Sequence, residues 1–130
     1  MLKSALLVTA GIGIGFGANA VLAQNTAPFF QIAEINVKDQ AAYEASGVDK
    51  VREGLMAEGG KLIAGGYNKA TLIDGGPPVG NRYLVFQYPN KEAAEKAWTA
   101  HIKPWQTSEK VMKVATFRLI GVEAAKTDMK

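Results

Sequence analysis

Four runs of β-branched and aromatic residues, each bounded by polar or turn residues, predict four β-strands. Within these runs apolar and polar positions alternate, which is typical of strands that present one face to a core. The fragment Ala70–Ile73 is predicted to continue the second strand or to pair with it, before a strong turn at Asp74–Pro78. The predicted strands are Phe29–Val37, Lys61–Tyr67, Asn81–Tyr88 and Ala115–Val122.

Two segments between the strands carry apolar residues at helical spacing. Asp39 is a suitable N-cap for the first, which is predicted to run through Gly47 as one helix until Gly59-Gly60 ends it. Asn90 is the predicted cap of the second helix, which Pro104 is predicted to break. A further helical turn or two is expected between Gln106 and Lys113. The apolar positions of the first helix are Ala41, Ala45, Val48, Val51 and Leu55, and one face of the second carries Ala94, Ala97, Trp98 and His101.

The predicted element order is β-α-β-β-α-β, which indicates an α+β, ferredoxin-like fold. Such a fold has a four-stranded antiparallel sheet with both helices on one face. The helix side is expected to take Phe29, Ala33, Ile35 and Val37 from the first strand and Leu84, Phe86 and Tyr88 from the third. The open face then mixes apolar groups with Glu34, Asn36 and Gln87. This face is too apolar to leave wet, so we expect a homodimer that packs two sheets together around a small cavity.

The first segment predicts where the protein works. Lys3 precedes an uncharged, glycine-containing stretch from Ala5 to Gly17, and Val21-Leu22-Ala23 has the small-residue pattern of a cleavage site. The stretch is shorter than the ~20 residues of a spanning helix, which favours a signal peptide over a retained membrane anchor. We therefore expect a signal-peptide helix over 1–23, cleavage after Ala23, and a periplasmic or secreted protein. A linker over 24–28, one domain over 29–122 and a charged tail over 123–130 complete the division.

Charge and composition exclude several classes of function. The 15 Lys and Arg and 12 Asp and Glu give a net charge of +3, and the two signs alternate along the chain. The sequence contains no block of basic residues, so nothing in its charge pattern indicates a nucleic-acid partner. The sequence has no cysteine, which excludes disulfides, thiolate nucleophiles and cysteine-based metal sites.

Several short motifs, in order and spacing, resemble the DUF1330 family of the dimeric α/β-barrel superfamily. They are Gly59–Gly66 (GGKLIAGG), Asp74-Gly75, Pro77-Pro78, Arg82–Pro89 (RYLVFQYP) and Glu92-Ala93-Ala94. The resemblance covers roughly Phe29 to Val122 and implies a dimeric barrel built from two sheets. This chain departs from the family pattern at Ala64, at Gln87 and over His101–Trp105. The first two departures replace charged residues of the family, so an activity that relies on those charges is not implied here.

His101 is the only histidine of the chain. A lone imidazole could act as a proton shuttle or as an axial ligand of haem, which related barrels bind. Without cysteine or a second histidine it cannot complete a closed metal site, and near a helix end it interacts favourably with the helix dipole. The pattern therefore favours a structural residue, and no metal or cofactor is expected.

Further candidate residues follow from side-chain chemistry. Arg82 can hold an anionic ligand or pair with an acid such as Glu34 or Asp74. Tyr67 and Tyr83 can donate hydrogen bonds to a ligand, although tyrosine is also an ordinary strand residue. Glu34 is the best candidate general base if it lies in the apolar cavity, because desolvation raises a carboxyl pKa. A large aromatic such as Trp98 is either a buried anchor or a pocket wall.

Two functions remain at this point. The first is an exported homodimer whose inter-sheet cavity binds a small, partly apolar molecule through Arg82, Tyr67 and Gln87. The second is a cofactor-independent enzyme of the isomerase or monooxygenase type, in which Glu34 or His101 removes a proton. The sequence slightly favours the first, because it offers no clear acid and base pair. Whether the protein is an enzyme stays open.

Overall fold

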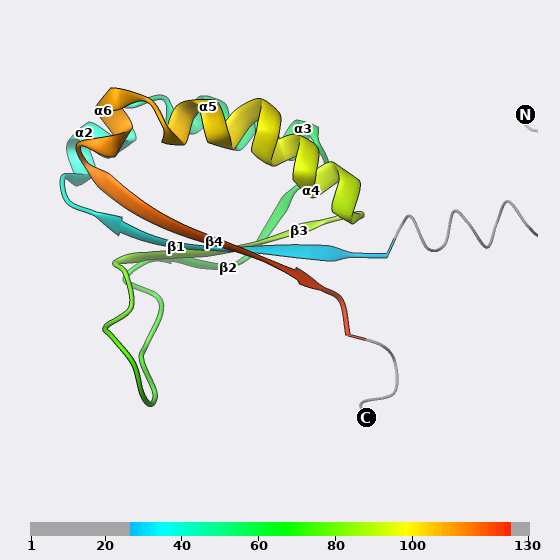
Figure 1. Ribbon diagram of the computed structural model, residues 1–130, viewed down its shortest axis with the longest axis horizontal. Coiled ribbons are helices and arrows are strands. Elements are labelled where there is room, and N and C mark those ends of the chain that lie inside the picture. Colours follow the sequence, from blue (N-terminus) through cyan, green and yellow to red (C-terminus); the bar gives the residue numbers. More distant parts are fainter. Residues whose placement is uncertain (1–26, 126–130) are drawn as a thin grey trace, which may run out of the picture.

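Four antiparallel strands form one sheet in the order β2-β3-β1-β4, with the helices on one face and the other face open (Figure 1). The computed structural model describes residues 27–125, so the predicted signal peptide and the end of the charged tail lie outside the described residues. The fold class is confirmed, and the strands nearly match the predicted bounds. They are β1 (Phe29–Val37), β2 (Lys61–Tyr67), β3 (Arg82–Tyr88) and β4 (Ala115–Glu123).

The first crossover consists of two helices, α2 (Gln40–Glu44) and α3 (Val48–Ala57), where one continuous helix was expected. Asp39 caps α2 as predicted, because its Oδ1 accepts a hydrogen bond from the backbone N–H of Ala42 at 3.1 Å. The expectation of one helix was wrong because Gly47 adopts a φ of 97°, a left-handed conformation that ends α2 and redirects the chain into α3.

The second crossover runs through α4 (Lys91–Ala97), a π-helical turn η2 (Trp98–Ile102), α5 (Lys103–Gln106) and α6 (Glu109–Met112). The predicted cap is confirmed, because Asn90 Oδ1 accepts from the N–H of Ala93 at 2.8 Å. The predicted break at Pro104 was wrong. This proline lies in the first turn of α5, where a missing backbone N–H is tolerated.

Within residues 27–125, no helix is long and apolar enough to cross a bilayer.

Side chains alternate between the two faces of the sheet as the sequence predicted. Along β3, Leu84, Phe86 and Tyr88 are buried beneath the helices, and the residues between them are only half-buried on the open face. Arg82 has the same parity as these core residues and is buried with them. The core therefore lies between the sheet and the helical layer, and it includes one charged side chain.

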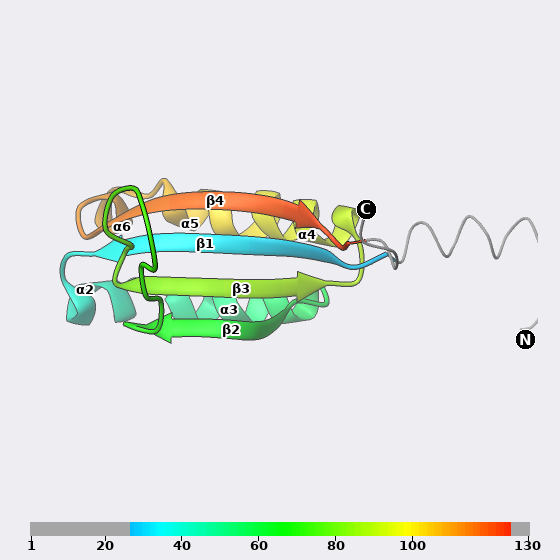
Figure 2. The same cartoon turned by 90° about the horizontal axis from the view of Figure 1, so that it is seen from below.

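The connection between β2 and β3 contains no strand, so the expected pairing of Ala70–Ile73 was wrong. This connection projects on the open side of the sheet and crosses the strands when seen from that side (Figures 1 and 2). Ile73 is 94% exposed, because the excursion carries it away from any partner strand. The loop ends at Asn81, whose side chain accepts from the N–H of Val37 at 2.8 Å and donates to its carbonyl at 2.7 Å.

Strand β2 carries a bulge, because its register against β3 shifts between Leu62 and Ala64. Just after the bulge, Gly65 has a φ of 107°. A Cβ at Gly65 would lie only 1.8 Å from the carbonyl oxygen of Tyr83. Glycine is therefore required here for the edge strand to stay hydrogen-bonded to β3.

Candidate helix-side cavity

A cavity of about 50 Å³ lies between the helix side of the sheet and the helical layer. We call it the inner cavity. Its lining is mostly apolar, with Phe86 and Phe117 contributing from the sheet beside aliphatic side chains. No Asp, Glu or Lys lines it. Its polar or aromatic hydrogen-bonding members are Gln31, Tyr43, Arg52, Arg82, Trp105 and Gln106.

Arg82 is the buried cation of this cavity, with only 7% of its surface exposed. Its guanidinium carbon lies 4.4 Å from the ring centroid of Tyr67 and 5.5 Å from that of Tyr43. Among the described residues, no carboxylate forms an ion pair with it, so the predicted pair with Glu34 or Asp74 is not formed. Burying a guanidinium without a counter-ion is unfavourable, and the two aromatic faces offset only part of that cost.

Two buried polar atoms of the inner cavity have no hydrogen-bond partner within residues 27–125. They are the Nε of Arg82, a donor, and the Oε1 of Gln106, an acceptor. An unmade hydrogen bond at a buried group costs roughly 1–3 kcal/mol, and native proteins rarely leave one without a reason. Both residues line the inner cavity, so a ligand bound there could supply the acceptor that the Nε–H of Arg82 lacks.

The wall beside Arg82 is held rigidly by aromatic packing. Trp105 lies edge-on to Tyr43 at 5.6 Å and to Phe117 at 5.4 Å between ring centroids. Its indole N–H donates to the hydroxyl of Ser46 at 3.1 Å, and that hydroxyl donates to the Tyr43 carbonyl at 2.6 Å. This wall of the cavity is therefore fixed by core packing rather than by flexible surface groups.

The tyrosines around Arg82 remain protonated at neutral pH. Burial raises the pKa of Tyr67, and the hydrogen bond that its hydroxyl donates to Glu44 raises it further. Burial also raises the pKa of Tyr43, although the charge of Arg82 opposes the shift. Since neither phenol ionises, neither supplies an anion to neutralise Arg82.

The predicted inter-sheet cavity does not bring its expected residues together. Arg82 and Tyr67 are paired across β3 and β2 and lie on the helix side, whereas Gln87 and Tyr83 lie on the open face. The physical reason is strand parity, because residues five apart on one strand point to opposite faces. Glu34 is also on the open face, where its Oε2 accepts from the N–H of Gly80 at 3.3 Å.

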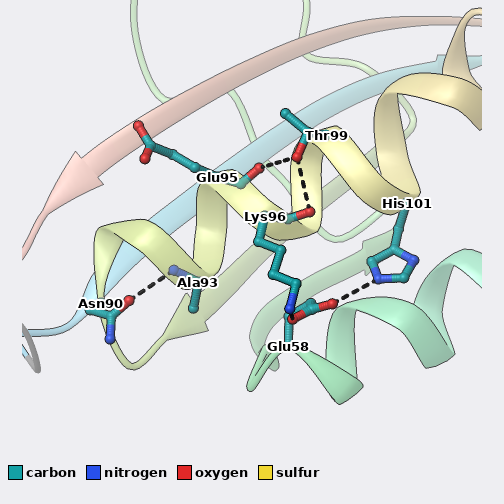
Figure 3. Close-up of polar contacts among 7 residues, drawn as sticks. All are labelled: Glu58, Asn90, Ala93, Glu95, Lys96, Thr99 and His101. Atoms are coloured by element: carbon teal, nitrogen blue, oxygen red, sulfur yellow. Dashed lines mark hydrogen bonds and ion pairs between the residues drawn. The ribbon is translucent and has the colours of Figure 1, made fainter.

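His101 lies outside the inner cavity and joins the two helical crossovers. Its Nε2 is 3.1 Å from Oε2 of Glu58, at the end of α3, and Lys96 Nζ is 3.6 Å from the other carboxylate oxygen (Figure 3). The hydrogen bond with His101 is the main cause that lowers the pKa of Glu58. A Cβ at Gly54 would lie 2.3 Å from His101 Nδ1, so the ring is packed against α3. These surroundings do not fit a haem ligand.

The remaining expectations on ligands concern Trp98 and metals. Trp98 lines a second hollow, between the second crossover and the edge of the sheet at β4. In the part of the chain that the structure describes, no three His, Asp or Glu side chains gather as metal ligands would. The structure thus places Trp98 on a pocket wall.

Sequence reasoning missed Gln31, Tyr43 and Gln106 as members of a site. One signal was present, because Gln31 occupies a helix-facing position on β1 between the apolar residues Phe29 and Ala33. A polar residue at a core parity indicates either a buried hydrogen bond or a binding site. No comparable signal identified Gln106, which reaches the cavity only through the packing of α5.

The comparisons with known proteins support the fold. No protein-family model matches the sequence. No curated protein matches it either. The chain is similar to the crystal structure of RPA0582, a protein of unknown function from Rhodopseudomonas palustris. That similarity has a TM-score of 0.58 and 18% identity over 90% of this chain and 96% of that one.

Two further structures are similar. Methylated RPA0582 gives a TM-score of 0.59 and 17% identity over 94% of this chain and 98% of that one. SnoaB, a cofactor-independent oxygenase from Streptomyces nogalater, gives a TM-score of 0.50 and 13% identity over 78% of this chain and 96% of that one. At these identities the similarity shows a shared α+β fold, and the resemblance to the DUF1330 family is not confirmed by a family model.

Proposed function

We propose that this protein is a DUF1330-like, ligand-binding domain whose inner cavity binds a small organic anion. The observation that carries the proposal is the buried guanidinium of Arg82, which lines the cavity, has no carboxylate partner in the described residues and keeps an Nε–H without an acceptor. A ligand carboxylate or enolate would supply both the missing charge and the missing acceptor.

Electrostatics favour an anion over a neutral or cationic ligand. The charged lining residues are Arg82 and Arg52, both cations, and the apolar walls keep the local dielectric constant low. Arg52 is the more exposed of the two and forms an ion pair with Asp49 at 2.9 Å, so its effect is partly compensated and screened by water. Arg82 therefore supplies most of the attraction for a buried anionic group.

The test compares Arg82→Met with Arg118→Met, which removes the same charge from an exposed position on β4. Binding of small carboxylates is measured by NMR titration of the purified protein. A charge-assisted hydrogen bond contributes about 1.5–3 kcal/mol, so Arg82→Met should weaken binding by roughly 10- to 150-fold. Arg118→Met should leave affinity nearly unchanged. Equal losses in both variants would show a general charge effect and reject the site.

The alternative, a cofactor-independent enzyme, has less support from the placement of its candidate bases. Glu34 lies on the open face and His101 is paired with Glu58, and neither lines the inner cavity. A general base has to come within hydrogen-bond reach of the proton that it removes. The fold that the chain shares with an oxygenase does not by itself carry the activity across. Binding without chemistry is the function that this geometry supports better.

We further propose that the protein acts as a homodimer through its open sheet face. Apolar side chains gather there, and Ile120 and Val122 are 38% and 42% exposed on β4. Their register partners on the neighbouring strand β1 are Ile32 and Phe30. The four side chains therefore form a continuous patch rather than isolated residues. Covering this patch with a second copy would remove the apolar surface from water.

Native mass spectrometry tests the dimer through Ile120→Lys, which places a charge in the apolar patch of the proposed interface. Met112→Lys is the matched control, because Met112 is 61% exposed on α6, away from the open face. The wild type and Met112→Lys should have twice the chain mass, and Ile120→Lys should have the chain mass alone. A monomeric wild type at micromolar concentration would refute this part of the proposal.

A further inference from the structure

A second hollow, of about 390 Å³, lies between the second crossover and the edge of the sheet at β4. We call it the outer groove. Phe29, Trp98 and Leu119 give it apolar walls. Gln31, Gln106 and Leu119 line both the outer groove and the inner cavity, so these three side chains form the partition between the two spaces.

The partition is not held closed by strong hydrogen bonds. The hydroxyl of Tyr88 donates to Gln31 Oε1 at a long 3.5 Å, and Gln106 Oε1 has no partner within residues 27–125. Long side chains with weak or missing partners can change rotamer at little cost. A ligand in the inner cavity can therefore extend between these two amides into the outer groove.

The volumes indicate how a ligand would divide between the two spaces. A cavity needs roughly 10–15 Å³ to hold one water molecule, and pockets for whole organic ligands span roughly 300–1,000 Å³. The inner cavity, at about 50 Å³, suits a head group such as a carboxylate with its first carbons. The outer groove, at about 390 Å³, is large enough for the remainder of a larger molecule.

Charge sets the direction in which such a ligand lies. Both charged groups of the inner cavity are cations, Arg82 and Arg52, whereas the charged residue of the outer groove is Glu95, an acid. A carboxylate is attracted to the inner end and repelled from the outer one. The apolar remainder of the molecule then rests against Trp98 and Leu119.

We propose that the ligand class is an amphiphilic monocarboxylic acid, with its head at Arg82 and an unbranched apolar tail in the outer groove past Trp98. This inference rests on the proposed function, because it assumes that the inner cavity binds an anion. It adds the chemical class of that anion, its orientation and the subsite that selects for length.

Butanoate, octanoate and dodecanoate are the probes, each titrated into the purified protein by two-dimensional NMR. A fully buried methylene is worth up to about fourfold in Kd, so affinity should rise from butanoate to octanoate and level off where the groove ends. The indole N–H resonance of Trp98 should shift with octanoate and stay unchanged with butanoate, whose short chain does not pass the partition.

Variants of the groove separate the tail subsite from the head subsite. Trp98→Ala should reduce the improvement in Kd for each added methylene to below about twofold, while the affinity for butanoate stays unchanged. Trp98→Phe keeps an apolar wall and should retain most of the dependence on chain length, and it serves as the folded variant if Trp98→Ala is unstable. Thr99→Ala is the matched control, because Thr99 is the exposed neighbour on the same helical turn and should behave as the wild type.

The outcomes distinguish this inference from the proposed function. If butanoate binds in a manner that depends on Arg82 but longer acids bind no tighter, the tail subsite is overturned and the anion site stands. If acids of every length fail to bind, the anion site itself is overturned. If long acids bind the wild type and Arg82→Met equally well, they adsorb to apolar surface, which overturns the proposed orientation.

Discussion

Replacing the buried Arg82 by methionine should leave stability nearly unchanged, although most substitutions of a buried residue are destabilising. The variant removes a buried Nε–H without a described partner, whose desolvation costs roughly 1–3 kcal/mol. It also removes the cation–π contacts at 4.4 Å to Tyr67 and 5.5 Å to Tyr43. Such contacts are worth roughly 0.5–2 kcal/mol each, so the two effects nearly cancel. Methionine is flexible and apolar, and it refills the space that the aliphatic stem of Arg82 occupies.

We therefore expect Arg82→Met to change the free energy of unfolding by less than about 1 kcal/mol in either direction. Urea denaturation followed by tryptophan fluorescence measures this, with Trp105 reporting directly from the cavity wall. Leu84→Ala is the matched control on the same strand face. It should lose about 2–5 kcal/mol, because it leaves a cavity in the core.

A loss of more than about 3 kcal/mol in Arg82→Met would refute the reasoning. That magnitude is typical of breaking a buried ion pair, and it would mean that a carboxylate partner already holds the guanidinium in the free protein. The argument for an unsatisfied anion site would then fail. An unchanged or raised stability, combined with lost carboxylate binding, would show that Arg82 is retained for function at no benefit to folding.

Three other predictions follow from single residues. The pKa of Glu58 is lowered in the folded protein, mainly by His101, so its stabilising effect is present above the ordinary value of 4.5 and is lost as the pH falls through the lowered value. Glu58→Gln should flatten the fall in the free energy of unfolding at acidic pH. If urea denaturation at a series of pH values gives the same fall for the wild type and for Glu58→Gln, this prediction is contradicted. Gly65→Ala should lower the melting temperature well beyond Gly76→Ala, because both sites have positive φ but only the first has backbone 1.8 Å from the new Cβ. N-terminal sequencing of the protein from the periplasm or culture medium should begin directly after Ala23, and an intact start would favour a retained anchor.

Local sequence patterns were sufficient for the strands and for the helix caps. The alternation in β3 correctly divided Leu84 and Phe86 from the residues of the open face, because strand parity depends only on position along the chain. The caps at Asp39 and Asn90 were equally readable, because an Asx side chain bonds to the backbone three residues on. These features are set by neighbouring residues alone.

The helix interruptions were harder to predict from the sequence. Gly47 and Pro104 each allow more than one outcome, because glycine is tolerated within a helix at a small cost and proline is tolerated in a first turn. The structure resolves them in opposite senses. The helix breaks at Gly47, whereas the π-helical turn Trp98–Ile102 leads directly into α5, whose first turn contains Pro104. Packing of the helices on the sheet makes that choice, and packing is not visible in a local pattern.

The sequence by itself determined the order of the elements, the faces of the strands and the absence of cysteine chemistry. It also placed Arg82 at the same strand parity as the core residues Leu84 and Phe86. Only the tertiary structure decided which side chains share a cavity, because Arg82 on β3, Tyr43 on α2 and Gln106 on α5 are far apart in the chain. Their meeting depends on how the two helical crossovers pack over the sheet, and that packing is a property of the whole fold.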